Sequence, residues 1–278
     1  MPQIEAKDFS FTYSGSPSPS IRDLNLEIER GEFILLTGPS GCGKTTLCRC
    51  LNGLIPNFYA GHWEGEFRVC GIDITKAKTY ELAKLVGHVF QNPENQLFSL
   101  SVEREIALGP ENLGLPRDEI RQRVEWAMEL VGISDLRYLA PYELSGGQQQ
   151  KVAIASVLAM RPEILVLDEP TSFLDPKSAK AILETIARLN EELDMTVILV
   201  EHRLDLAARL VDRVLVMSEG RLALDGKPKE IFGKAAHLMG VGLPKVTLLF
   251  QMLREDGLEV EIPTTVEEAS AILRGLLD

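Results

Sequence analysis

The chain has 278 residues, of which 45% are hydrophobic and 25% charged, and its formal net charge at pH 7 is −12. This composition is typical of an ordinary globular protein, and the negative charge argues against a nucleic-acid partner, because phosphates attract Lys and Arg. No apolar run approaches the roughly 18 residues of a membrane span, and residues 1–13 lack the features of a secretory signal, so we expect a cytosolic polypeptide.

Two expected strands open the chain. Residues 4–11 alternate imperfectly between apolar and polar side chains, and residues 21–28 alternate more clearly. A loop rich in Ser, Pro and Gly separates them at residues 14–20. Phe33–Leu36 is a short continuous apolar run, which is typical of a buried strand in a parallel sheet.

A phosphate-binding loop follows this apolar run. Gly38–Thr45 reads G-P-S-G-C-G-K-T, which fits the pattern G-x-x-x-x-G-K-[ST], and Thr46–Leu51 is suited to a helix. Glycines let the backbone close around phosphate groups, and the N–H groups at a helix start attract anions. In this pattern Lys44 contacts the β- and γ-phosphates, and the Thr45 hydroxyl ligates Mg²⁺. The sequence therefore predicts a nucleotide site with Mg²⁺.

A second helix start of the same kind lies about a hundred residues further on. A helical block is expected at residues 93–140, and Leu144–Gln148 then reads L-S-G-G-Q. Its Ser-Gly-Gly opens a helix that continues to Met160. A chain with one phosphate lysine and two phosphate-facing helix starts is most simply interpreted as half of a shared site.

Several expected strands end in polar residues. Val86–Phe90 precedes Gln91, Ile164–Leu167 precedes Asp168 and Glu169, and Thr196–Val200 precedes Glu201 and His202. Consecutive strand residues face opposite ways, so the two adjacent carboxylates can do different work. Together with Val214–Met217, these strands alternate with helical patterns. The alternation predicts an α/β core with a mixed, mainly parallel sheet.

Two helices are expected after the core. Apolar side chains between residues 246 and 253 recur at i, i+3, i+4 and i+7, and Gly257 is suited to end that helix. The T-x-x-E segment that starts at Thr265 resembles a capping box before a second amphipathic helix. Such a pair can pack on its own chain or form a partner surface, including a homodimer contact, and the sequence leaves both open.

These motifs, in this order, resemble those of the ATP-binding subunit of an ABC transporter, and the resemblance covers nearly the whole chain. It implies an ABC-type P-loop ATPase core interrupted by a helical subdomain and followed by a helical tail. The segments implied are 1–92 and 161–235 for the core, 93–160 for the helical subdomain with the L-S-G-G-Q motif, and 236–278 for the tail, a possible dimerisation element.

The resemblance also assigns roles to single residues. Glu169 would polarise the attacking water, His202 would contact the γ-phosphate, and Gln91 would sense the metal and the water. Mg²⁺ would be held by Thr45, Gln91 and Asp168, and Tyr13 would stack on adenine. The ATP-binding residues implied are Tyr13, Gly38, Pro39, Ser40, Gly41, Cys42, Gly43, Lys44, Thr45 and Thr46 of one copy and Ser145, Gly146, Gly147 and Gln148 of a second.

The resemblance implies a cycle in which two copies face head to tail, close with ATP bound and reopen on hydrolysis, which drives a membrane partner. Ser172–Asp175 matches the segment that crosses between the copies. Phe173 is bulkier than the small residue often found there, which leaves the local packing open. Both halves of the shared site are intact in this chain, so homodimer and heterodimer are both compatible with the sequence.

One stretch narrows the resemblance within the family. Phe90–Phe98 reads F-Q-N-P-E-N-Q-L-F, and Ala107–Leu115 reads A-L-G-P-E-N-L-G-L. These segments look like those of the ATPases of energy-coupling factor (ECF) transporters, which import vitamins and transition-metal ions. The implied partners are an integral membrane coupling protein and a small substrate-binding membrane protein. The chain would then be a peripheral protein at the cytoplasmic face of the cell membrane.

Two alternatives remain from the sequence. One is the ATPase of another ABC importer or exporter. The other is a soluble ABC ATPase acting on DNA or ribosomes, which the negative charge and the lack of a long coiled-coil insertion disfavour.

A docking groove is expected between the core and the helical block. Leu54–Tyr59 and Glu94–Phe98 supply apolar surface and one acid, Glu94, which is a candidate partner for the arginines that coupling helices carry in the ECF family. The alternative is that Phe58 and Tyr59 pack in the core and Glu94 is only solvated.

Overall fold

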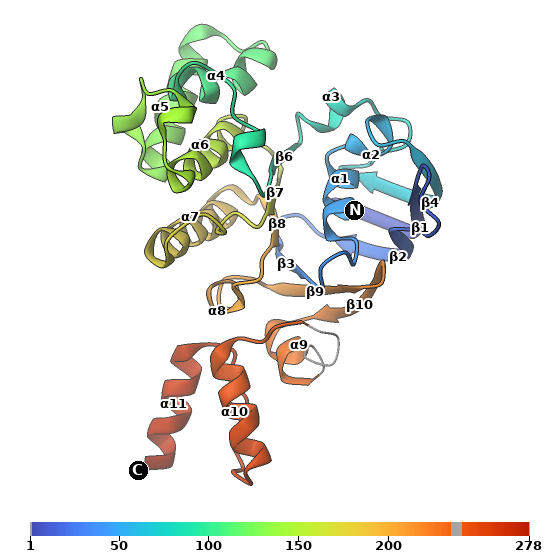
Figure 1. Ribbon diagram of the computed structural model, residues 1–278, viewed down its shortest axis with the longest axis vertical. Helices are drawn as coiled ribbons and strands as arrows, with labels where there is room; N and C mark the ends of the chain where they lie inside the picture. The colour runs from blue at the N-terminus through green and yellow to red at the C-terminus, as the bar shows by residue number, and fades with distance from the viewer. Residues whose placement is uncertain (1, 235–240, 278) are drawn as a thin grey trace.

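A computed structural model gives the structure of the chain and describes residues 2–234 and 241–277. Two sheets lie beside a block of helices, and two C-terminal helices extend from the opposite end of the molecule (Figure 1). The expected fold class, an α/β core with a helical insertion and a helical tail, is therefore confirmed. The expected division into segments stays a prediction, and its boundary between residues 235 and 236 lies outside the described residues.

The first sheet is antiparallel and has the strand order β2-β1-β4-β5. It contains β1 (Ile4–Tyr13), β2 (Ile21–Ile28), β4 (Gly61–Val69) and β5 (Ile72–Asp73). In β2 buried and exposed residues alternate from Leu24 to Ile28, so its apolar side chains face the core. The strand β1 extends two residues beyond the expected end, and Tyr13 is its last residue.

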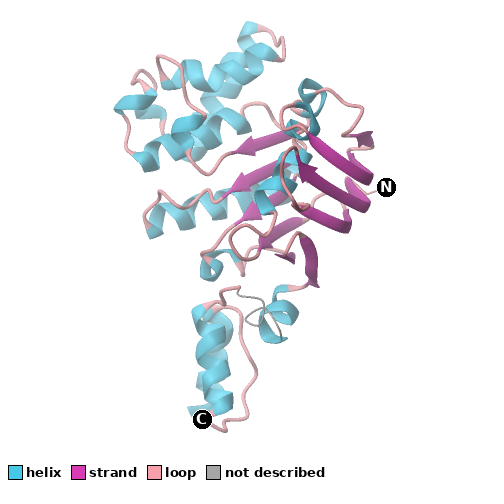
Figure 2. Ribbon diagram, turned by 45° about the vertical axis from the view of Figure 1, so that its right-hand side comes forward, coloured by secondary structure: helices cyan, strands magenta, loops and turns pink. Residues whose placement is uncertain are grey.

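The second sheet has the order β10-β9-β3-β8-β7-β6, and all of its pairs are parallel except β9 with β10. Its central strands are buried on both faces, as their uninterrupted apolar sequences predict. The strands are β3 (Phe33–Thr37), β6 (Val86–Val89), β7 (Ile164–Asp168), β8 (Thr196–Val200), β9 (Arg213–Ser218) and β10 (Arg221–Gly226). Figure 2 shows the two sheets side by side, with helices between and around them.

The helical block consists of α4 (Val102–Asn112), α5 (Arg117–Val131) and α6 (Gly146–Leu158). Its apolar core is continuous with the one beneath the parallel sheet, because buried residues of α6 and of β3 belong to the same cluster. The remaining helices of the body are α1 (Lys44–Leu51), α2 (Leu54–Asn57), α3 (Thr79–Leu82), α7 (Pro176–Leu193), α8 (Leu204–Ala207) and α9 (Pro228–Lys234), with short 3-10 turns at Pro93–Asn95, Ser134–Leu136 and Pro141–Glu143.

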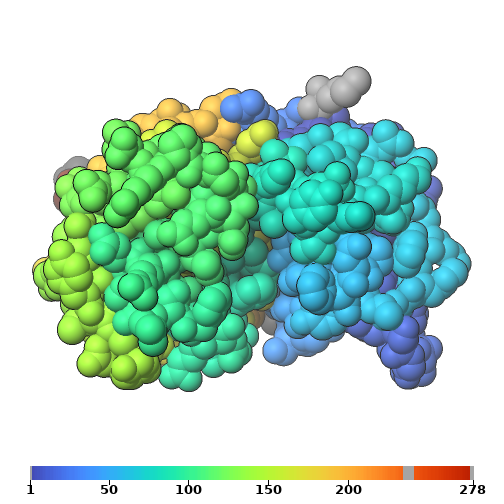
Figure 3. Space-filling model, turned by 90° about the horizontal axis from the view of Figure 1, so that it is seen from above, coloured from blue at the N-terminus to red at the C-terminus, as the bar shows by residue number. Residues whose placement is uncertain are grey.

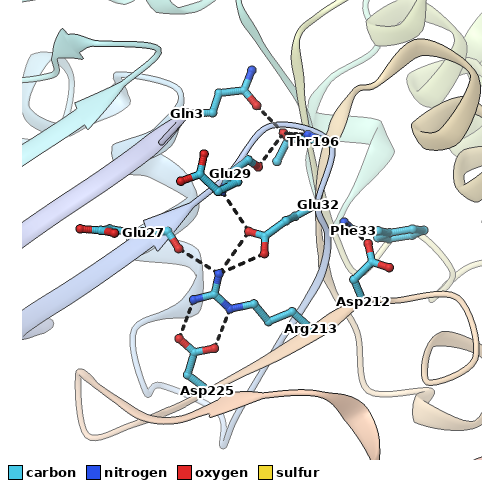
Figure 4. Close-up of polar contacts among 10 residues, drawn as sticks. Gln3, Glu27, Glu29, Glu32, Phe33, Thr196, Asp212, Arg213 and Asp225 are labelled. Carbon is cyan, nitrogen blue, oxygen red and sulfur yellow. Dashed lines mark hydrogen bonds and ion pairs between the residues drawn. The ribbon is translucent and has the colours of Figure 1, made fainter. Parts of the chain in front are cut away.

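Arg213 joins the two sheets next to the first residue of β3 (Figure 4). Arg213 on β9 forms a two-pronged contact with Asp225 on β10, at 2.6 and 2.7 Å. Its Nη1 also donates to the Glu27 carbonyl of β2, at 2.9 Å, and to the Glu32 carboxylate, at 3.1 Å. This network fixes the entry into β3, so the loop that leaves β3 has a rigid base.

The C-terminal helices α10 (Lys245–Glu255) and α11 (Val266–Leu277) share a small core of their own. Half of the expected capping box is present, because the Glu268 N–H donates to Thr265 Oγ1 at 3.2 Å, whereas the Glu268 carboxylate accepts from the N–H of Thr264 at 2.7 Å. Several apolar side chains remain exposed on the pair, namely Leu248, Leu249, Met252, Val266 and Leu273. A partner surface on this face stays a prediction. No helix in the described part of the chain is long and apolar enough to cross a membrane.

Candidate functional site

Four neighbouring parallel strands end at one edge of the second sheet. In the order β3-β8-β7-β6, each is followed by a segment that the sequence singled out: the phosphate loop, His202, the Asp168–Glu169 pair and Gln91. The register aligns these ends, since Leu36 lies opposite Val200 and Val200 opposite Asp168. The carboxyl ends of parallel strands are where ligands bind in open α/β sheets.

The phosphate loop needs glycine at two of its positions. Gly38 has φ +148°, and a Cβ there would lie 2.2 Å from the Met217 carbonyl oxygen. Gly43 has φ +109°, and a Cβ there would lie 2.5 Å from the Ser20 carbonyl oxygen. The loop can therefore lie this close to its neighbours only without side chains, and it delivers the chain directly into α1.

Lys44 is buried in this loop. Its Nζ donates to the carbonyl oxygens of Gly38, at 2.7 Å, and Pro39, at 2.9 Å, and lies 3.8 Å from the Sγ of buried Cys42. No carboxylate of the described residues forms an ion pair with it. A buried cation held by neutral oxygens is well suited to an incoming phosphate.

Thr45, Gln91 and Asp168 line one pocket of about 380 Å³. The Thr45 hydroxyl donates to the Asp168 carboxylate at 3.3 Å. Burial, together with the nearby charge of Glu169, raises the pKa of Asp168. The described residues contain no group of three or more His, Cys, Asp or Glu placed to hold a metal by themselves. A hydroxyl, an amide and one carboxylate fit Mg²⁺, which usually keeps waters and shares substrate phosphates.

Glu169 brings the other two candidate catalytic residues together. Its Oε2 accepts a hydrogen bond from Gln91 Nε2 at 2.8 Å, and its Oε1 lies 3.2 Å from His202 Nε2. Three loops, each following a different strand, thus meet at one carboxylate. The backbone of Glu169 has φ +50°, and its N–H donates to the Val200 carbonyl at 2.9 Å. A left-handed glutamate is uncommon, and such strain collects at functional sites.

Glu201 is a supporting residue that the sequence analysis did not assign. It is buried, and its carboxylate accepts from the hydroxyl and N–H of Thr171 and from the N–H groups of His202 and Arg203. It therefore ties the loop that carries His202 to the loop that follows Glu169. The sequence feature that could have identified Glu201 is its position directly between a buried strand and a candidate histidine.

The L-S-G-G-Q segment forms the N-terminus of α6. Ser145 is the N-cap, and its side chain accepts a hydrogen bond from the Gln148 N–H. The Gln148 side-chain oxygen in turn accepts from the Ser145 N–H at 2.9 Å, which completes a capping box. The segment lines a separate hollow of about 590 Å³, which shares no residue with the pocket at Thr45. Phe173 is half-exposed and lies over Gly146, where a Cβ would be 3.5 Å from its ring. A Cβ on Gly147 would lie 3.3 Å from the Phe173 carbonyl oxygen, so the backbone at Phe173 also lies close to the start of α6.

Tyr13 lies beside the phosphate loop but is anchored by its hydroxyl. Its Oη is 3.2 Å from Thr46 Oγ1 and accepts from Arg49 Nη1 at 3.1 Å. The rings of Phe11 and Tyr59 meet it nearly at right angles, with centroids 4.9 and 6.1 Å away. The structure therefore brings the expected base-stacking residue to α1, the helix that begins with Lys44.

A third cavity is a cleft of about 290 Å³ that separates the core from the helical block (Figure 3). Its walls include Leu54 and His88 from the core and Phe98, Leu108 and Met160 from the other side. His88 is buried, and no described residue forms a hydrogen bond with its Nε2. Burial, with the charge of Arg49 nearby, lowers the pKa of His88 to about 4, so its ring is neutral at physiological pH.

The stability of the protein should fall in acid because of His88. The pKa of His88 is about 6.5 in the unfolded chain and about 4 in the folded chain. Between these two pH values only the unfolded chain gains the proton, so the free energy of unfolding decreases as the pH falls from about 6.5 to about 4. Between about pH 7 and pH 4, wild type should lose about 2–3 kcal/mol more than His88→Gln. Urea unfolding at both pH values measures this difference. Parallel losses in the two proteins would contradict it.

The chain is similar in sequence to known ATP-binding proteins of transporters. A sequence model of the family described as ABC transporter matches residues 21–172. The energy-coupling factor transporter ATP-binding protein EcfA1 of Caldanaerobacter subterraneus subsp. tengcongensis is 43% identical over 275 residues, which cover 95% of this chain and 96% of that protein. Two relatives from Methanosarcina acetivorans, described as ABC transporter ATP-binding proteins, are 46% and 48% identical, but the chain spans only 42% of the length of each.

Two solved structures are similar over most of the chain. One is cbiO1 from Clostridium perfringens, described as part of the ABC transporter complex cbiONQ, with 35% identity and a TM-score of 0.75 over 90% of this chain and 99% of that one. The other is the ATP-binding cassette MJ0796, a dimer in a post-hydrolysis state bound to ADP and Pi, with 30% identity and a TM-score of 0.72 over 81% of this chain and 98% of that one.

Proposed function

This chain belongs to the ABC transporter family of ATP-binding proteins, and from that premise we propose that it is the ATP-hydrolysing subunit of an ECF-type importer of vitamins or transition-metal ions. The observation that carries the proposal is the meeting of Gln91, Glu169 and His202 beside the phosphate loop. The similarity to EcfA1 and to cbiO1 supports the ECF type over other ABC transporters.

Hydrolysis would use Glu169 as the group that accepts a proton from the attacking water. Phosphoryl transfer needs positioning and charge stabilisation more than covalent chemistry from the protein. Gln91 and His202 hold the Glu169 carboxylate from two sides, so its orientation is fixed before a substrate arrives. When the nucleotide binds, His202 can turn to the γ-phosphate and Gln91 to the water.

Mg²⁺ would be held by Thr45, Gln91 and Asp168 together with the phosphates of ATP. When bound, the ion supplies positive charge that neutralises the phosphate oxygens. Lys44 adds a fixed charge on the side of the phosphate loop. The remaining loop residues would surround the phosphates with N–H groups at the start of α1.

A second copy, or a closely related subunit, would complete each site. Ser145–Gln148 lie in a hollow separate from the pocket at Thr45, so one copy offers both halves of a site on different surfaces. Head-to-tail pairing would bring the α6 N-terminus of one copy to the ATP of the other. The dimeric arrangement of MJ0796 with ADP and Pi supports this pairing.

The membrane partner would dock at the cleft between the core and the helical block. Phe98 lines this cleft, and Phe58 directly follows α2, whose Leu54 lines it. Both phenylalanines are 73% exposed, which favours a docking surface over the alternative of core packing. An integral coupling protein with a small substrate-binding membrane protein is the partner type that the ECF similarity supports. The subunit would then be held peripherally at the cytoplasmic face of the cell membrane.

Glu94→Arg should weaken assembly with the membrane subunits and leave the turnover of the isolated chain intact. Glu94 is exposed on the turn beside the cleft, and the described residues form no ion pair with its carboxylate. Placing like charges across an interface costs several kcal/mol, so recovery of the complex should fall by about tenfold or more. Co-purification of the membrane subunits and basal turnover are the two measurements.

Glu111→Arg is the matched control, because Glu111 is also exposed but lies at the far end of α4, outside the residues that line the cleft. Equal recovery of the complex with both variants would show that Glu94 is not the docking acid.

Affinity purification of the full chain from its native membranes, followed by mass spectrometry, tests the proposed function. We expect an integral membrane coupling protein and a small substrate-binding membrane protein in constant ratio to the chain. Recovery of ribosomal or DNA-associated proteins instead would favour a soluble ABC ATPase. Recovery of membrane subunits of another transporter type would retain the ATPase role and reject the ECF type.

A further inference from the structure

Arg49 lies between two tyrosines that have different expected roles. It belongs to α1, the helix that begins with Lys44. Its Nη1 donates to the hydroxyl of Tyr13 at 3.1 Å, and its guanidinium carbon lies 4.2 Å from the centre of the Tyr59 ring. One side chain thus contacts both the expected base-stacking residue and the exposed segment that contains Phe58.

Arg49 is held by aromatic side chains rather than by carboxylates. None of the ion pairs among the described residues includes it. It is partly buried, and it lines the same pocket as Thr45, Gln91 and Asp168. Its planar guanidinium serves instead as a hydrogen-bond donor to one tyrosine and as a cation over the face of another.

We propose that Arg49 is a positioning residue that holds Tyr13 for the nucleotide base and couples it, through Tyr59, to the docking surface at Phe58–Tyr59. The proposal rests on the proposed function, because it takes Tyr13 as the base-stacking residue and the cleft as the docking site. The contacts that carry the positioning role are those to the two tyrosines, and variants that keep the charge of Arg49 separate this role from the effect of that charge on the nearby Asp168 and His88.

The coupling has a simple physical origin. Tyr13 and Tyr59 are joined edge to face, with ring centroids 6.1 Å apart, and Arg49 connects both to α1. A base that stacks on Tyr13 favours one arrangement of the Tyr13, Arg49 and Tyr59 side chains. A partner that packs on Tyr59 also favours one arrangement of these three side chains. If the two arrangements agree, each ligand strengthens the binding of the other by the same factor.

The first test compares ATP with inorganic tripolyphosphate, which contains the phosphates but neither base nor ribose. Stacking on an aromatic side chain is worth about 1–3 kcal/mol, so Tyr13→Ala should weaken ATP by about fivefold or more. Arg49→Met should weaken ATP by about threefold or more through loss of the hydrogen bond to Tyr13. Tyr13→Ala should not change tripolyphosphate affinity, because the phosphate loop is intact, and neither should Arg49→Lys, which keeps the positive charge in the pocket. A loss of tripolyphosphate affinity in Arg49→Met measures the missing charge, and only the further loss seen with ATP reports on the base.

Two further variants separate positioning from general damage. Arg49→Lys keeps the charge but loses the planar group, so it should weaken ATP relative to tripolyphosphate as Arg49→Met does. Tyr13→Phe already lacks the hydroxyl that Arg49 contacts. Adding Arg49→Met to Tyr13→Phe should therefore reduce ATP affinity less than Arg49→Met does in the parent. Arg68→Met removes an exposed arginine on β4 and serves as the control, with both affinities unchanged.

The second test measures ATP affinity of the isolated chain and of the assembled membrane complex. The parent should bind ATP more tightly in the complex, and Arg49→Met should remove most of that difference. If Arg49→Met binds ATP like the parent while Tyr13→Ala does not, the positioning role is wrong and the base site stands. If Tyr13→Ala also binds ATP normally, the assignment of the base site itself is wrong. If the difference in ATP affinity between the isolated chain and the complex is the same in Arg49→Met as in the parent, the proposed coupling is wrong.

Discussion

Glu169→Gln should bind ATP normally and lose nearly all turnover. The amide has almost the shape of the carboxylate, but it cannot accept a proton from water, and positioned proton transfer contributes about 10²–10⁴-fold to rate. Gln91 and His202 both contact this side chain, so the replacement is held where the carboxylate was. Phosphate release under saturating Mg-ATP, measured with nucleotide affinity on the same preparation, gives both quantities.

Glu192→Gln makes the same chemical change at an exposed position on α7 and is the control for preparation and folding. It should retain full turnover. If Glu169→Gln keeps turnover within about twofold of the parent, a loss far smaller than positioned proton transfer implies, Glu169 is not the catalytic carboxylate.

Lys44→Ala should act on binding rather than on the chemical step alone. Lys44 Nζ is buried, and the described residues offer it only neutral partners in its own loop. A bound phosphate would therefore be its first negatively charged partner. A hydrogen bond to a charged group is worth roughly 1.5–3 kcal/mol, which predicts a loss of about tenfold to a hundredfold in ATP affinity. Titration calorimetry with ATP measures the change.

Lys180→Ala removes an exposed lysine from α7 and is the matched control. Its ATP affinity should equal that of the parent. An equal affinity in Lys44→Ala would contradict the interpretation of Gly38–Thr45 as a phosphate loop, provided that its unfolding curve matches that of the parent.

The local motifs could be predicted because short sequences determine their geometry. Gly38–Thr45 and Ser145–Gln148 each start a helix where expected, and in the first of them Gly38 and Gly43 lie where a Cβ would clash with a neighbouring carbonyl oxygen. The buried strands of the parallel sheet were also predicted, because each is a short, uninterrupted apolar run.

The antiparallel sheet was only partly predicted. Residues 61–66 of β4 are largely polar and exposed, so their sequence carries no strand pattern. The strand exists because it pairs with β1, from Ile4 opposite Val69 to Tyr13 opposite Gly61. Such a pairing joins residues far apart in the sequence, and periodicity within one segment does not reveal it.

The candidate site was predicted as a set of residues but not as an arrangement. Gln91, Glu169 and His202 meet because β6, β7 and β8 are neighbours in the sheet, and strand order is not a property of any one segment. The positive φ of Glu169 and the supporting role of Glu201 depend on the same packing. Exposure of Phe58, which favours docking over core packing, likewise required the structure.

The central claim, that two copies share each ATP site, is tested most directly by the dependence of pair affinity on ATP. In the Glu169→Gln background, dilution experiments by analytical ultracentrifugation should show that Mg-ATP tightens the pair by about tenfold or more, because a ligand that binds across an interface stabilises it. Adding Ser145→Arg should remove this tightening while ATP affinity of the separate copy stays within about threefold, since the proposal places Ser145 at the other copy's nucleotide. Equal pair affinity with and without Mg-ATP in Glu169→Gln, or loss of ATP binding by the separate Ser145→Arg copy, would contradict the shared site.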